Sequence, residues 1–250
     1  MNIKTQLIPI GTKRRSGTKI TKVAFFVDHD TGNPDSTAQN NVTYFINSAN
    51  EMSASAHLFV DDKEAIMCIP CLDNTEKAWH VLYEKRKDNQ LYGGDSNDIA
   101  VGIELCYFPN DKVRTLKAYS NYIEIAAYLA KFHNVDPNKR SGHLELDPER
   151  KTDPNNALKY IGKTYVDMKK DILNKYNEMY ATKEINTIED ACYFLKGKAF
   201  EDADGWLVKA KANPRMADIF MAFAKGWDTI KDTQYFDVIL QNVLKNMKVG

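Results

Sequence analysis

The sequence lacks the features that mark several large classes of protein. It carries 34 Lys and Arg against 34 Asp and Glu, so its formal net charge is zero. Nucleic-acid-binding domains usually carry a basic stripe, whereas the short basic run at Lys13–Arg15 is diluted by polar neighbours. No stretch approaches the roughly 18 consecutive apolar residues of a membrane span. The composition therefore predicts neither a nucleic-acid partner nor a membrane partner.

A secretion signal is also missing from the start of the sequence. Residues 1–17 do not have the basic segment followed by a long apolar core that such signals need. We therefore expect the protein to be made and left in a cytoplasm, so that any extracellular target has to be reached by another export route.

Cysteine is scarce, with four residues in 250, which excludes a disulfide framework. Cys68 and Cys71 form a C-x-x-C pair flanked by apolar residues. The pair could be redox-active or half of a zinc site, but a four-cysteine site needs a second pair, and Cys106 and Cys192 stand alone. Because free cysteine behaves mostly as a small buried hydrophobe, we expect structural thiols.

Strand patterns alternate with helix patterns over about the first 175 residues. Continuous apolar runs that end at turn residues predict strands over Val23–His29, Ser55–Val60, Glu64–Ile69 and Ile99–Phe108. The second and third of these flank a predicted hairpin turn at Asp61–Lys63. Apolar residues at helical spacing predict helices over Ser36–Ser48, Thr115–His133 and Lys163–Tyr176. Alternation of this kind indicates an α/β domain.

The pattern becomes all helical toward the carboxyl terminus. Asn177–Asn186 is polar and reads as a linker, and Thr187–Asp190 resembles a capping box that opens a helix. Two helical faces are then predicted from Met216, Phe220, Phe223, Trp227 and Ile230, and from Phe236, Ile239, Leu240, Val243 and Met247. We therefore expect a domain over residues 1–177, a linker over 178–186 and a helical module over 187–250.

Two histidines and several charged residues stand where packing does not explain them. His29 ends a buried strand, and strand ends that open into loops are where α/β proteins place their sites. His143 lies in a polar segment, residues 141–154, that shows no helical or strand period and also contains Lys151 and Asp153. Two histidines and a carboxylate suit a catalytic zinc site, because they leave a fourth position open for water.

Hydrolysis also needs a proton carrier and a donor to the oxyanion. Glu104 is the candidate base, since it interrupts an apolar strand, where a charge costs free energy unless it has a partner. Lys151 is the candidate oxyanion donor. On these residues alone, a metal site and a set of solvated loop charges both remain open.

The order of the motifs resembles the zinc-dependent N-acetylmuramoyl-L-alanine amidases. This family is shared by phage endolysins, cell-wall recycling amidases and animal peptidoglycan-recognition proteins. The resemblance covers about residues 20–175. It rests on His29-Asp-Thr31, Ser55–Asp61, Ala78-Trp79-His80, Val101–Glu104 and Gly142–Pro154.

The resemblance implies a fold, a substrate and residue roles. The fold would be α/β, a mixed central β-sheet flanked by helices, followed here by the small helical module. The substrate would be bacterial cell-wall peptidoglycan, cut at the amide between N-acetylmuramic acid and L-alanine. One Zn²⁺ would be the cofactor. The implied roles are metal binding for His29, His143 and Asp153, catalysis for Glu104 and Lys151, and substrate binding for Thr31, Trp79 and His80.

Two positions depart from the pattern of many relatives. The third metal ligand is Asp153 where many phage relatives have Cys, and the Gly that usually follows the last Asp-Pro is Asn155. Asn tolerates left-handed backbone angles, so we expect the turn to survive there. His57 and His133 are expected to be structural, while His80 is open between substrate binding and packing.

The resemblance leaves two functions to separate. The first is a phage-type endolysin that reaches the wall through a holin pore, with the helical module as a wall-binding domain. The alternative is a recognition protein that binds peptidoglycan without cutting it. The set of ligands with Glu104 and Lys151 favours the first. The sequence does not fix the oligomeric state.

Overall fold

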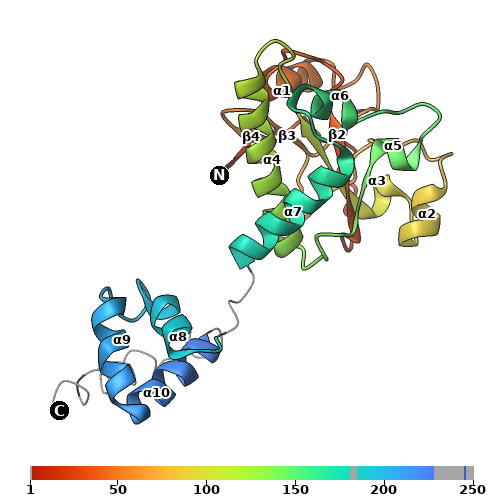
Figure 1. Cartoon of the computed structure of the whole chain (residues 1–250). Helices are drawn as coiled ribbons and strands as arrows, with labels where there is room; N and C mark the ends of the chain where they lie inside the picture. The colour runs from red at the N-terminus through yellow and green to blue at the C-terminus, as the bar shows by residue number, and fades with distance from the viewer. Residues whose placement is uncertain (1, 181–184, 228–244, 246–250) are drawn as a thin grey trace. The chain divides into compact units, whose positions relative to one another are not determined.

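A six-stranded sheet forms the centre of the first of two compact units, Met1–Tyr180 and Ala181–Gly250 (Figure 1). The computed structural model describes residues 2–180, 185–227 and 245. The strands are β1 Ile3–Thr5, β2 Phe25–Asp30, β3 Leu58–Val60, β4 Ala65–Met67, β5 Ala100–Leu105 and β6 Arg140–Gly142. Their order is β1-β4-β3-β5-β2-β6, and every neighbouring pair is parallel except β3 and β4. The predicted mixed sheet is confirmed.

The antiparallel pair is the hairpin predicted from the sequence. Its turn is closed by the Asp61 side chain, whose Oδ1 accepts hydrogen bonds from the backbone N–H groups of Lys63 and Glu64 at 2.7 and 2.8 Å. An Asp that bonds to the backbone two residues ahead favours a turn. The hairpin lets the chain reverse between the otherwise parallel strands.

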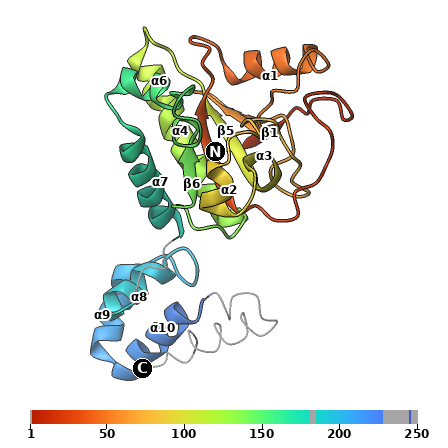
Figure 2. The ribbon, with the colours of Figure 1, turned by 90° about the vertical axis from the view of Figure 1, so that its right-hand side faces the viewer.

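Side-chain alternation divides the sheet into two faces. On one face Phe26, Leu58 and Ile103 pack in the main core against helices on that side. These helices are α4 Lys112–Phe132 and α7 Tyr165–Tyr180. Figure 2 shows both on the opposite side of the sheet from α1.

The second face is covered at two separate places. α1, Ala38–Asn47, packs on Phe59 and Ile66. Phe25 and Val27 pack elsewhere with Leu146. The short helices of the unit are α2 Lys87–Tyr92, α3 Ser96–Ile99, α5 His143–Leu146, α6 Asn155–Leu158 and η1 Lys159–Ile161. Gly102 and Glu104 of β5 and His29 of β2 alternate with the main-core residues and so point to this second face.

A buried ionic network fixes β2 just before His29. The carboxylate of Asp28 accepts hydrogen bonds from Arg140 Nε at 3.0 Å, Tyr122 OH at 2.7 Å and Tyr165 OH at 2.8 Å. Asp28 is fully buried and Arg140 is 2% exposed. Because consecutive strand residues point to opposite faces, this network holds the strand while leaving His29 free to face the other side.

The structure corrects three expectations near the site and at the end of the first unit. The segment 141–154 is not irregular throughout, because β6 ends in it and α5 begins at His143. Asn155 does not adopt a left-handed conformation: it begins α6, and its N–H donates to Thr152 O at 2.9 Å, which turns the chain. α7 continues to Tyr180, four residues beyond the expected helix end at Tyr176.

The second unit contains three described helices. They are α8 Ile188–Leu195, α9 Ala203–Ala212 and α10 Pro214–Lys225. The predicted capping box is present, since the side chain of Thr187 and that of Asp190 each bond to the other's backbone N–H. Trp206 contacts Phe200 and Phe220 in the unit's own aromatic cluster. The expected apolar positions from Ile230 to Val243, and Met247, lie outside the described residues. Among the helices that the structure describes, none is long and apolar enough to cross a membrane.

Candidate active site

A polar pocket of about 340 Å³ opens on the second face of the sheet, where β2 and β5 end. His29 and Glu104 are register partners on these parallel strands, so their side chains emerge side by side. All eight residues singled out from the sequence line this one pocket: His29, Thr31, Trp79, His80, Glu104, His143, Lys151 and Asp153. Residues spread over more than a hundred positions of sequence thus meet at one strand end.

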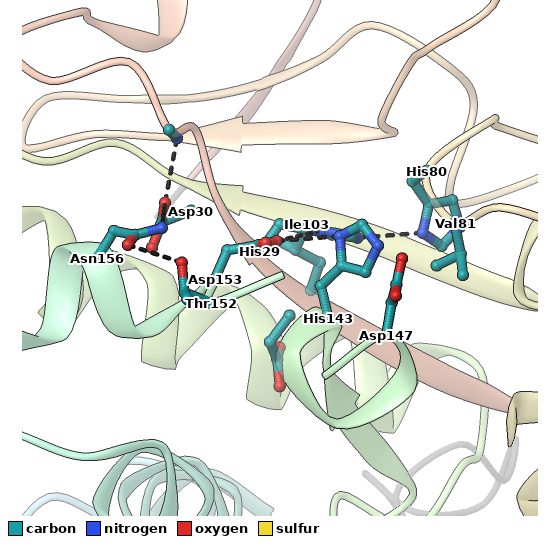
Figure 3. A network of polar contacts seen from close by, with 12 residues as sticks. His29, Asp30, His80, Val81, Ile103, His143, Asp147, Thr152, Asp153 and Asn156 are labelled. Atoms are coloured by element: carbon teal, nitrogen blue, oxygen red, sulfur yellow. Dashed lines mark hydrogen bonds and ion pairs between the residues drawn. The ribbon is translucent and has the colours of Figure 1, made fainter. Parts of the chain in front are cut away.

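Three buried side chains converge in the pocket as a candidate metal group. One potential ligand atom from each of His29, His143 and Asp153 lies within 4.8 Å of the other two. Asp153 Oδ2 is 2.9 Å from His29 Nδ1 and 3.1 Å from His143 Nδ1 (Figure 3). Ligands held 2.0–2.1 Å from a tetrahedral zinc ion are roughly 3.3 Å apart. The donor types and the two Asp153–histidine distances therefore suit a metal ion such as zinc.

The protonation states of the group also suit a cation. Burial alone would raise the pKa of Asp153, but hydrogen bonds with His143 and His29 outweigh it and hold that pKa well below its ordinary value. Burial lowers the pKa of His143 to about 4. The pKa of His29, which burial also lowers, is raised overall by its hydrogen bond to Asp153. Asp153 as an anion and His143 as a neutral imidazole thus have the forms that bind metal ions at neutral pH, whereas the raised pKa of His29 favours a proton that a bound metal ion would displace.

Glu104 is a half-buried residue whose carboxylate has one buried oxygen, Oε2, without a hydrogen bond among the described residues. Burial raises the pKa of Glu104 to about 8, and the charge of a cation in the pocket would act in the opposite direction. A general base works best with a pKa near the operating pH. The position of Glu104 in the pocket and the direction of its pKa shift are therefore those that a general base needs.

Lys151 supplies a positive charge at the rim. It forms no ion pair within the part of the chain that the structure describes, and its backbone N–H donates to Asp147 O at 2.9 Å. The buried Asp147 side chain pairs with Lys85 at 3.0 Å and with Arg150 at 2.7 Å. These pairs hold the turn, so the Lys151 ammonium remains available to a ligand.

Sequence reasoning missed a bridge that holds the Asp153 segment. Asp30, one residue beyond the predicted strand end at His29, is the last residue of β2. Its carboxylate accepts from Ala157 N at 3.1 Å and Asn156 Nδ2 at 3.2 Å, and Thr152 Oγ1 donates to Asn156 Oδ1 at 2.9 Å (Figure 3). The bridge therefore spans both sides of Asp153. The only signal in the sequence was that Asp30 follows a ligand histidine.

The segment that carries Trp79 and His80 is held by its backbone. Trp79 N donates to Ser55 Oγ at 3.0 Å, and the N–H groups of His80 and Val81 donate to Asn97 Oδ1 at 2.8 and 3.1 Å. The Asn97 amide also donates to Val81 O at 2.7 Å. Asn97 is a second residue that the sequence did not single out, because its position far along the chain gives no sign of this contact.

His57 and His133 are both bonded to backbone groups. His57 Nε2 bonds to Glu76 O at 2.8 Å, its Nδ1 accepts from Gly102 N at 3.0 Å, and burial lowers its pKa to about 4. His133 Nε2 bonds to Cys71 O at 2.8 Å. These contacts fit the structural roles expected for both.

The cysteine pair is not equipped for redox chemistry or metal binding. Cys68 and Cys71 are free and fully buried. Burial raises the pKa of Cys71 to about 12 and that of Cys68 further. Reactive and metal-binding cysteines need thiolates, whereas these thiols stay protonated at neutral pH.

Comparison with known proteins agrees with this geometry. The family described as N-acetylmuramoyl-L-alanine amidase matches residues 19–156, which is more than half of the chain. The N-acetylmuramoyl-L-alanine amidase BlyA of Bacillus subtilis is 36% identical over 107 residues, covering 40% of this chain and 28% of BlyA. The chain therefore matches well under half the length of that relative.

Two solved structures share the fold of the first unit. The catalytic domain of XlyA superposes with a TM-score of 0.54 at 26% identity, covering 69% of this chain and 99% of that domain. A mutant endolysin from Bacillus subtilis gives a TM-score of 0.54 at 25% identity, with coverage of 69% and 99%. With the matched region enclosing the whole pocket, the chain belongs to the N-acetylmuramoyl-L-alanine amidase family.

Proposed function

We propose that the first unit hydrolyses peptidoglycan at the amide between N-acetylmuramic acid and L-alanine. The observation that carries this proposal is the meeting of His29, His143 and Asp153 with Glu104 and Lys151 in one open pocket. Membership of the amidase family supports the choice of substrate. A protein that only binds the wall does not need a carboxylate with a buried, unbonded oxygen beside a metal group.

In this proposal His29, His143 and Asp153 hold one Zn²⁺. When bound, zinc acidifies a water molecule and polarises a carbonyl oxygen. Glu104 takes the proton that the attacking water gives up, and later passes it to the departing alanine nitrogen. The Lys151 ammonium neutralises the negative charge that develops on the amide oxygen.

Thr31, Trp79 and His80 belong to the wall of the pocket in the same proposal. Thr31 and Trp79 are partly exposed there, so they can touch the substrate on either side of the scissile amide. A second hollow of about 480 Å³ shares Trp79, His80 and Lys151 with the first, which gives an extended polymer room to continue.

The test is digestion of purified Gram-positive cell walls by the full chain. We expect new alanine amino groups without new reducing sugars, loss of cleavage with a chelator and recovery with added zinc. The Glu104→Gln variant is the matched control, because it keeps the shape of the side chain and removes its basicity. Tight binding without new amines on several wall types would favour the recognition protein instead.

The second unit is proposed to be a wall-binding module. We place it at residues 187–250, after a linker that follows Tyr180 rather than the expected start at 178, and its support is a hydrophobic core of its own. The likeness to an endolysin structure supports a phage-type enzyme that reaches the wall through a holin pore. Sedimentation with purified walls is expected to retain the full chain more strongly than residues 1–180. Equal retention would assign all wall binding to the first unit.

A further inference from the structure

We propose that His80 is a positioning residue for the metal ligand His29, which it holds through the second ring nitrogen of His29. This role differs from a direct grip on the substrate, which the family resemblance implies for His80. The inference rests on the proposed metal site.

The contact between the two histidines uses the nitrogen that faces away from the metal group. His29 Nδ1 points to Asp153, and His29 Nε2 lies 3.1 Å from His80 Nδ1. The ring centroids are 5.3 Å apart and the planes are nearly perpendicular at 85°, so one ring meets the other by its edge. Figure 3 shows contacts that run from Asp153 through His29 to His80.

The tautomers follow from this geometry. A neutral imidazole has one nitrogen that donates and one that accepts. If His29 binds a metal ion through Nδ1, its proton sits on Nε2 and can only be donated to His80 Nδ1. His80 then carries its own proton on Nε2. Metal-bound histidines commonly donate their other N–H to such a partner, which fixes the ring orientation.

His80 is held firmly enough to serve as that partner. Its ring lies against Gly102 of β5, where a Cβ atom would be 2.8 Å from His80 Nδ1, so only glycine leaves room for it. Asn97 fixes the backbone N–H of His80. His80 is 8% exposed. Packing against Gly102, the fixed backbone and the small exposed area suit an internal support better than a substrate contact.

The two ring nitrogens of His80 separate the two roles. Nδ1 faces His29, whereas Nε2 has no hydrogen-bond partner among the described residues and is the atom left for a substrate. An Asn side chain carries its amide oxygen on Cγ, as His carries Nδ1, so Asn at position 80 can still accept the hydrogen bond from His29 Nε2. A Gln side chain carries its amide one carbon further out, near the place of Nε2.

The experiment measures the zinc dissociation constant of the full chain by competition with a chromophoric chelator. Loss of the partner of a metal-bound histidine usually weakens metal binding about 10- to 100-fold. We expect that loss for His80→Ala and His80→Gln, and an affinity within a few-fold of the parent for His80→Asn. Thermal melts in excess chelator check that each variant folds.

Gly102→Ala provides an independent variant that leaves His80 in the sequence. Its added methyl group pushes the His80 ring away from His29, so zinc affinity is again expected to fall. Unchanged zinc affinity in His80→Ala, with a raised KM for wall cleavage and recovery of KM in His80→Gln, would overturn the inference and return His80 to the substrate. If the parent chain binds no zinc, the proposed function itself fails.

Discussion

Asp28→Asn is predicted to be among the most destabilising single changes in the first unit that leave every pocket residue in place. Asp28 accepts three hydrogen bonds, from Arg140, Tyr122 and Tyr165, on the face of β2 opposite His29. The side chains of Asp28 and Arg140 are both fully buried. Neutralising the carboxylate leaves the Arg140 guanidinium as an uncompensated buried charge.

The size of the effect follows from that burial. Breaking a buried ion pair from one side costs about 3–5 kcal/mol, whereas exposed pairs contribute about 0–1 kcal/mol. The matched control is Glu64→Gln, which removes the partner of the largely exposed Lys4. We therefore expect a loss of about 3–5 kcal/mol in the free energy of unfolding for Asp28→Asn and less than about 1 kcal/mol for the control.

Urea unfolding of the chelated protein measures both values, with tryptophan fluorescence and circular dichroism as independent probes. The double variant Asp28→Asn, Arg140→Met is expected to recover part of the loss, because the stranded charge is gone. A loss below about 1 kcal/mol for Asp28→Asn, or no recovery in the double variant, would refute the reasoning from an uncompensated charge.

Three further predictions concern the site and its surroundings. Glu104→Gln is expected to lower wall cleavage about 10²- to 10⁴-fold with zinc content unchanged, measured by amine release and metal analysis; loss of zinc would make Glu104 a ligand instead. Asn156→Ala removes the bridge beside Asp153 and, at about 0.5–1.5 kcal/mol per hydrogen bond, should weaken zinc binding about 2- to 10-fold; an unchanged zinc dissociation constant would contradict this. The pKa of His57 is about 4 in the folded chain, against 6.5 ordinarily, so the unfolded chain binds more protons between these values. The contribution of His57 to the free energy of unfolding should therefore fall by up to about 3 kcal/mol from pH 6.5 to pH 4. His57→Gln should remove this contribution, so an equal pH dependence of unfolding in the variant and the parent chain would contradict the prediction.

The sequence was informative where a strand is apolar and long. Phe25–Asp30 and Ala100–Leu105 are central strands that overlap the predicted strands Val23–His29 and Ile99–Phe108, so the strands that carry His29 and Glu104 could be located in advance, although β5 ends three residues before the expected Phe108. The short edge strands could not. Arg140–Gly142 is polar because its burial comes from the Asp28 network, which no local pattern reveals.

The hydrogen bonds of Asn97 and Asn156 that hold the site could not be predicted from the sequence, because they too depend on residues distant in the chain. Asn97 and Asn156 bond to residues 17 and 126 positions away in sequence, at His80 and Asp30 respectively, and an isolated Asn carries no period. The α7 helix continues four residues beyond the expected end at Tyr176. In this extra turn the rings of Tyr176 and Tyr180 contact each other, with 5.4 Å between their centroids. Polar composition alone had marked that stretch as a linker.

The central claim, that His29, His143 and Asp153 bind the zinc ion needed for hydrolysis, is tested most directly by zinc titration of the chelated full chain. Metal analysis and amine release from cell walls are followed in the same samples. The account predicts that activity returns in proportion to bound zinc and saturates at one ion per chain, and that Asp153→Ala shows neither at the same zinc concentration. Full activity in the chelated chain, or in Asp153→Ala without bound zinc, would contradict it.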